Sequence, residues 1–73
     1  MDINLTITLN EKLYLRNPEE SELGKRILEY SIILIERIGF EAFTFKKLAL
    51  EINTTEAGIY RYFEYKLRLL LYL

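Results

Sequence analysis

Apolar and polar residues alternate strictly over residues 3–9, Ile-Asn-Leu-Thr-Ile-Thr-Leu, near the start of the chain. A period of two puts successive side chains on opposite faces of a strand, so this segment predicts β structure, which Leu13 and Leu15 continue. A lone strand or hairpin is not stable in water. The segment therefore either packs on the rest of the protein or forms a loose tail, and the sequence leaves both open.

A helical period replaces the alternation over roughly residues 18–38 and predicts a long first helix. Asn17 is a good N-cap, Pro18 suits the first helical position, and Gly39 is a favoured residue just after a helix. Gly24 lowers the helix propensity of the first turns and allows a later start. Two apolar stripes run along the helix: Leu23, Ile27, Ser31, Leu34 and Ile38, then Leu28, Ile32 and Ile35. One stripe buries one side of a helix, so two stripes indicate cover on a second side.

Two shorter helices follow, separated by a polar turn. Thr44 can cap a helix over about residues 45–52, and Thr55 can cap another over about residues 56–63. Asn53 stands where a tight turn needs a left-handed residue, which Asn tolerates better than most. This arrangement is typical of a helix-turn-helix, whose second helix enters the DNA major groove.

Side-chain size supports the same arrangement. Ala49 is small where two crossing helices must approach closely, and Ile59 can fill the angle between them. A fourth helix begins near Tyr65 and is apolar almost without interruption to Leu73, with no stop signal. We therefore expect the chain to end inside an element of a longer protein.

These patterns together predict an all-α fold. It comprises a three-helix helix-turn-helix DNA-binding domain and the start of a fourth helix, preceded by an extended or hairpin-like N-terminal arm. The expected boundaries are residues 1–16 for the arm, 17–64 for the DNA-binding domain and 65–73 for the start of the fourth helix.

Composition narrows the possible functions. A chain of 73 residues holds at most one small domain. The sequence has no Cys and no His, which excludes disulfides, thiol nucleophiles, His-based metal sites and His acid–base catalysis. The apolar runs are too short to span a bilayer and no leader pattern opens the chain, so we expect a cytoplasmic protein without a membrane partner.

The net charge of −1 argues weakly against binding of nucleic acid, but the distribution of the charges along the chain weakens that argument. Residues 1–22 carry five acidic and two basic side chains, a net charge of −3. Residues 23–73 carry eight basic and six acidic side chains, a net charge of +2. The acidic excess thus lies in the arm, and the helical part is mildly basic.

Over residues 27–70 the chain resembles the TetR family of bacterial transcriptional regulators. The residues that carry the resemblance are Ile27-Leu28-Glu29, Gly39-Phe40, Thr44, Leu48-Ala49, Ile59-Tyr60-Arg61-Tyr62-Phe63, Lys66 and Leu69-Leu70. The resemblance implies a three-helix DNA-binding head on a larger helical domain that binds a small effector and forms a homodimer. That domain would lie outside this chain, and no cofactor is implied.

Five positions depart from the family pattern. They are Asn53 in place of Gly, Thr54 in place of an apolar residue, Glu56 in place of a basic one, Gly58 in place of a hydroxyl-bearing one, and Tyr65 in place of a small polar cap. These differences bear on the operator sequence and the affinity, and not on the fold.

The predicted contacts with double-stranded DNA lie on the three C-terminal helices. The residues are Thr44, Lys46, Lys47, Thr55, Glu56, Ala57, Gly58, Tyr60, Arg61, Tyr62 and Lys66. By resemblance, Tyr60 faces DNA, Tyr62 touches a phosphate at the groove edge, and Lys66 is the phosphate-binding Lys at the head of the fourth helix. A Lys beside helix N-terminal amides also makes a good phosphate site on physical grounds.

Several of these side chains have two interpretations. Arg61 can reach a guanine edge, a phosphate or only water, and Glu56 can accept from a cytosine amine or simply favour a helix N-terminus.

The leading hypothesis is the sequence-specific DNA-binding head of a regulator, expected to be a ligand-responsive repressor. The alternative is a helical protein-interaction module without DNA function. The sequence gives no support for an enzymatic function, because it shows neither a nucleophile–base pair nor a Gly-rich phosphate loop.

Overall fold

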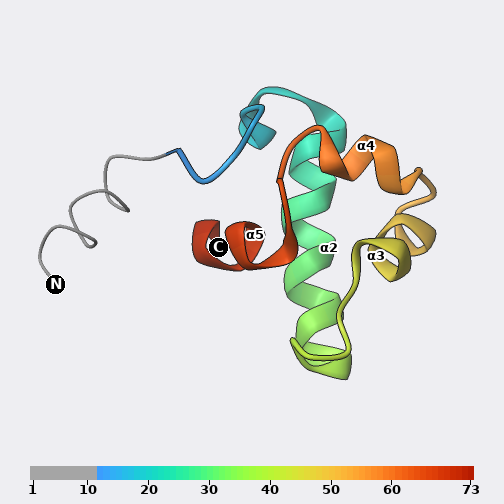
Figure 1. Cartoon of the computed structure of the whole chain (residues 1–73). Helices are drawn as coiled ribbons and strands as arrows, with labels where there is room; N and C mark the ends of the chain where they lie inside the picture. The colour runs from blue at the N-terminus through green and yellow to red at the C-terminus, as the bar shows by residue number, and fades with distance from the viewer. Residues whose placement is uncertain (1–11) are drawn as a thin grey trace, which may run out of the picture.

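A long helix, α2, forms the centre of the computed structural model, which describes residues 12–73 (Figure 1). The elements are η1 (Pro18–Glu20), α2 (Glu22–Ile38), α3 (Phe45–Glu51), α4 (Glu56–Tyr60) and α5 (Lys66–Tyr72). In Figure 1, α3 and α4 lie on one side of α2 and α5 lies on the other. All regular structure in residues 12–73 is helical, which confirms the predicted all-α fold. The strand predicted over residues 3–9 lies outside the described residues.

The first helix begins later than its strongest start signal indicates. Asn17 does accept a hydrogen bond from the Glu19 amide, but it caps only the short 3-10 turn η1. Ser21 then adopts an extended backbone and caps α2, with its Oγ accepting from the Gly24 amide at 2.9 Å. The predicted single helix over residues 18–38 is therefore divided at Ser21 into η1 and α2.

A close backbone contact explains why the break falls there. η1 folds back on α2 so tightly that a Cβ at Gly24 would lie 2.2 Å from the carbonyl oxygen of Pro18. Only glycine fits at that separation. Gly24, which on propensity alone weakens a helix, is thus the residue that lets η1 pack on α2.

The core lies between α2 and the three C-terminal helices. Its members are Ile27, Leu34, Phe43, Phe45, Leu48, Ala49, Ile52, Ile59, Tyr62, Phe63 and Leu69. The first apolar stripe of α2 supplies the buried side chains of that helix, including Ser31, whose hydroxyl is buried without a hydrogen-bond partner. The second stripe is less covered, and Ile32 remains 50% exposed.

The turn between α3 and α4 has the predicted left-handed residue. Asn53 has a φ of 59°. Its amide donates to the Leu50 carbonyl at 3.4 Å, and the Thr54 amide donates to the Ala49 carbonyl at 2.9 Å. These two bonds form a Schellman motif with Asn in the position that glycine usually takes. The Arg26 guanidinium of α2 donates to the Ile52 carbonyl and so fixes the same turn from the other side.

The third predicted helix is shorter than its pattern indicates, because α4 ends at Tyr60 rather than near Phe63. After it the backbone tightens, and the Tyr62 amide bonds to the Ile59 carbonyl three residues before it at 2.9 Å. Such tightening is common in the last turn of a helix. It leaves Tyr62 and Phe63 both buried and leads the chain to α5.

Residues 12–20 pack against the C-terminal part of the domain. The Leu15 amide donates to the Tyr62 carbonyl at 2.7 Å, and the Tyr14 and Tyr72 rings meet edge to face at 5.8 Å between centroids. The Tyr72 hydroxyl donates to Glu19 Oε2 at 2.9 Å. Desolvation raises the pKa of Tyr72, and the hydrogen bond to Glu19 and its negative charge act in the same direction. The described part of the arm is therefore packed and is not a loose tail.

Candidate nucleic-acid interface

The helix-turn-helix is formed by α3, the Asn53 turn and α4, and each helix begins at a threonine cap. Thr44 Oγ1 accepts from the Lys47 amide and Thr55 Oγ1 accepts from the Gly58 amide, both at 3.0 Å. Both threonines are exposed. Because both hydroxyls accept these bonds, the two threonine side chains are held in fixed orientations at the solvent-exposed beginnings of α3 and α4.

The outer face of α4 carries Glu56, Ala57 and Tyr60, with Arg61 following at the helix end, and all four are exposed. The Tyr60 ring is 48% exposed and packs edge-on against Phe45 of α3, with 4.9 Å between ring centroids. Because Phe45 is itself buried, the Tyr60 ring has a rigid support. This face offers a carboxylate, a methyl group, a phenol and a guanidinium, and the carboxylate, methyl and guanidinium are of the kinds that contact base edges.

Two further cations lie in the first turn of α3. Lys46 and Lys47 are both exposed, and the Lys47 ammonium donates to the Ala42 carbonyl at 2.9 Å. Positive charge here opposes the helix dipole, so it lowers the stability of an isolated helix slightly. The same placement suits attraction of a phosphate backbone.

Gly58 lies on the inner side of α4, away from the exposed face. It is buried, and a Cβ there would lie 3.0 Å from Thr54 Oγ1, 3.4 Å from Thr55 Oγ1 and 3.8 Å from Leu23 Cδ2. The hydroxyl-bearing residue common at this position of the family would therefore press on the two threonines. A contact between Gly58 and DNA stays a prediction.

Tyr62 is also directed inward. Its side chain is 2% exposed, and its hydroxyl lies 2.6 Å from Ser21 Oγ. The Arg16 guanidinium covers the ring at 5.3 Å from its centroid. The phosphate contact expected for Tyr62 stays a prediction, and in this structure the phenol joins α2 to the end of α4.

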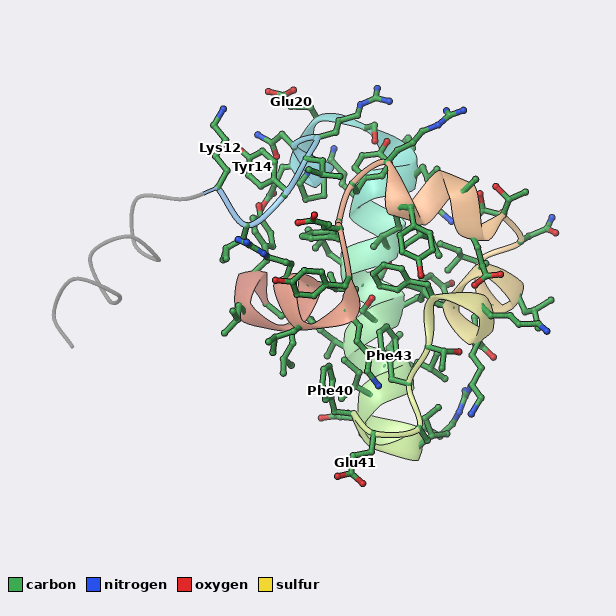
Figure 2. All side chains as sticks on the ribbon, viewed as in Figure 1. Lys12, Tyr14, Glu20, Phe40, Glu41 and Phe43 are labelled. Carbon is green, nitrogen blue, oxygen red and sulfur yellow. The ribbon has the colours of Figure 1, made fainter. Side chains whose placement is uncertain are left out.

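Lys66 is bound to the loop between α2 and α3. Its ammonium donates to the carbonyls of Phe43 at 2.8 Å, Phe40 at 2.9 Å and Glu41 at 3.3 Å. It also lies 4.6 Å from the centroid of the Phe40 ring. Figure 2 shows Phe40 and Phe43 pointing into the space between this loop and α5, with Glu41 directed outward. The predicted phosphate contact of Lys66 also stays a prediction.

The sequence did not predict the role of Arg26, which holds the Asn53 turn. Arg26 is adjacent to the buried Ile27 and so lies at the edge of the buried side of α2, which is the one signal its position gives. Its bond to the Ile52 carbonyl joins residues 26 positions apart, and no local pattern predicts such a pair.

The described residues also form a concave surface next to α3. An open cavity of about 270 Å³ is lined by Leu34, Arg37, Ile38, Lys47, Leu50 and Glu51. An ion pair of 2.9 Å between Arg37 and Glu51 lies at its edge. Within residues 12–73 there is no group of three or more acidic side chains placed to bind a metal, and no helix long and apolar enough to cross a membrane.

Comparison with known proteins agrees with this geometry. The family model described as bacterial regulatory proteins, tetR family, matches residues 27–73. The match begins at Ile27, the first buried apolar side chain of α2, and continues through α3, α4 and α5. Neither the search of curated proteins nor that of solved structures found a match.

Proposed function

The chain belongs to the tetR family of bacterial regulatory proteins, and we propose that it binds double-stranded DNA in a sequence-specific manner as the head of a transcriptional regulator. The observation that carries the proposal is the exposed face of α4, the helix that follows the left-handed Asn53 turn. A helix in that position, supported from behind by α3, is built to enter a major groove.

In the proposed complex α4 reads the bases. Glu56, Ala57, Tyr60 and Arg61 face the groove floor, since these side chains share the exposed side of α4. Arg61 is suited to a guanine edge and the Ala57 methyl group to a thymine methyl.

The proposed contacts with the DNA phosphate backbone come from residues at the beginnings of α3 and α4. Thr44 and Thr55 lie at the caps of α3 and α4, and Lys46 and Lys47 lie in the first turn of α3. Contacts of this kind set the register on the duplex, and base contacts specify the sequence. The proposed interface thus combines four positioning residues with the four on α4.

The family resemblance supports a finer proposal. We propose that the regulator is a cytoplasmic homodimer and a ligand-responsive repressor, whose small effector binds a separate helical domain. Exposed apolar side chains on α2 and α5 suit contact with such a domain, since Ile32 is 50%, Leu67 47% and Leu71 54% exposed. The same side chains are the observation that favours the alternative, a helical protein-interaction module without DNA function.

A salt titration of duplex binding tests the proposal against that alternative. Short duplexes from a random-sequence pool are the probe, and repeated selection from the pool reports sequence preference. We expect binding that falls steeply with salt, with a slope that drops by about 0.9 in each of Lys46→Ala and Lys47→Ala.

Lys12→Ala is the matched control, because Lys12 is exposed on the side of the molecule away from α3 and α4 (Figure 2). It removes the same charge and should leave the slope unchanged. Absence of duplex binding at low salt would exclude the DNA-binding function and favour the interaction module. An equal loss of slope in all three variants would exclude the docking face.

A further inference from the structure

Three carbonyl groups of one short loop converge on the Lys66 ammonium. The loop runs from Gly39 to Phe43, and the carbonyls are those of Phe40, Glu41 and Phe43, at 2.9, 3.3 and 2.8 Å. An ammonium group has three N–H donors, so these bonds use all of them. The charge is thus satisfied by the protein itself.

The loop depends on that charge. Carbonyl dipoles pointing at a common centre repel one another, and a cation between them removes the repulsion. The face of the Phe40 ring adds a cation–π contact at 4.6 Å. Without the ammonium the partly buried carbonyls of Phe40 and Phe43 would lack these bonds, so the loop would have to rearrange.

The same loop sets the beginning of α3. Phe43 is buried and meets Phe45 edge to face, with 6.4 Å between ring centroids. Thr44 lies between them and caps α3. The Lys47 ammonium donates to the carbonyl of Ala42 in this loop at 2.9 Å. A rearranged loop would therefore displace the cap and redirect the first turn of α3.

We infer that Lys66 is a positioning residue for DNA binding: its ammonium organises the loop over residues 40–43 and so orients the first turn of α3 toward the phosphate backbone. The inference rests on the proposed function. Lys66 thus has a role distinct from direct phosphate contact. Through Lys66, the beginning of α5 holds the first turn of α3, which faces the DNA in the proposed complex.

The experiment compares Lys66→Met and Lys66→Arg with the unaltered chain at a temperature where all are folded, as shown by circular dichroism. The duplex is the one selected from the random pool. Methionine keeps the length of the side chain without its charge. Arginine keeps the charge, but its planar fork does not present three donors to three carbonyls that converge on one point.

For Lys66→Met we expect about tenfold weaker duplex binding, because the first turn of α3, which carries Lys46 and Lys47, is no longer held toward the phosphate backbone. Amide hydrogen exchange of the free protein should quicken at Phe43 and Lys47 and stay unchanged at the amides of the Asn53 turn. Lys66→Arg should weaken binding to a similar extent. These results would support the positioning role.

Other results would overturn it. A direct phosphate contact predicts unchanged amide exchange in Lys66→Met and full binding in Lys66→Arg, because arginine binds phosphate at least as well. A purely stabilising role predicts a lower melting temperature with unchanged affinity of the folded protein. If the unaltered chain does not bind the duplex, the proposed function fails, and amide exchange in the free variants still decides whether Lys66 organises the loop. Should Lys66→Met not fold, affinity and exchange in Lys66→Arg decide the role.

Discussion

The Tyr62 hydroxyl lies 2.6 Å from Ser21 Oγ, and the same Ser21 oxygen caps α2 by accepting from the Gly24 amide. One serine thus serves a helix end and a buried phenol that comes 41 residues later in the chain. The pair joins the beginning of α2 to the segment after α4. We therefore expect both side chains to stabilise the folded domain, independently of any contact with DNA.

Tyr62→Phe should lower the free energy of unfolding by about 1 kcal/mol, because it leaves the Ser21 hydroxyl with one partner fewer. Ser21→Ala should cost more, because it also removes the cap of α2. Urea denaturation of both variants and of the double variant measures the coupling between them. A Tyr62→Phe variant with unchanged stability and weaker DNA binding would show instead that the phenol contacts phosphate.

Asn53→Gly should be neutral or stabilising by up to about 1 kcal/mol, since glycine takes the left-handed conformation without steric cost. The φ of Asn53 is 59°, and its side chain is exposed. Asn53→Val should destabilise the domain, because a β-branched residue tolerates this conformation poorly. Thermal melts that rank Val above Gly would contradict the role assigned to this turn.

Gly24→Ala should destabilise the domain by about 2–3 kcal/mol, because the new Cβ would overlap the Pro18 carbonyl and force η1 away from α2. Gly39→Ala is the matched comparison. Gly39 has a φ of 85°, a ψ of 156° and open space around its Cβ position, so alanine there costs only backbone strain of about 1–3 kcal/mol. An unchanged free energy of unfolding in Gly24→Ala, measured by urea denaturation, would mean that the contact with Pro18 is not limiting.

Tyr60→Ala should weaken duplex binding about tenfold or more if the exposed phenol faces the groove, and it should cost about 1 kcal/mol of stability through the lost contact with Phe45. Tyr60→Phe keeps that contact and so separates the two effects. Tyr14→Phe removes a hydroxyl on the side away from α3 and α4 and serves as the control (Figure 2). Full duplex binding by Tyr60→Ala would remove this residue from the proposed interface.

Local chemistry was enough to predict the helix-turn-helix. The threonine caps and the left-handed Asn53 each depend on a few neighbouring atoms, and residue type indicates such features directly. The predicted contacts in and after α4 are divided in the structure: Glu56, Ala57, Tyr60 and Arg61 are exposed, whereas Gly58 and Tyr62 are buried. In these respects the sequence predicted the fold.

Contacts between distant segments were not predictable in this way. The break at Ser21 depends on how closely Pro18 approaches Gly24, although Asn17 is a good start signal in its own right. The three carbonyls around Lys66 belong to a loop 23–26 residues earlier in the chain. A lysine at the head of a helix has the same local pattern whether it binds phosphate or carbonyl groups.

The packing of residues 12–20 has a consequence for the order in which the domain folds. The bond between Glu19 and Tyr72 spans 53 residues, so it closes a long loop, and such contacts carry the largest entropic cost. Contacts within α3 and α4 are far more local and can form first. The segment should therefore dock after the rate-limiting step. Tyr72→Phe should then speed unfolding and leave the folding rate unchanged, a φ-value near zero in stopped-flow kinetics, whereas a slower folding rate would place this contact in the folding nucleus.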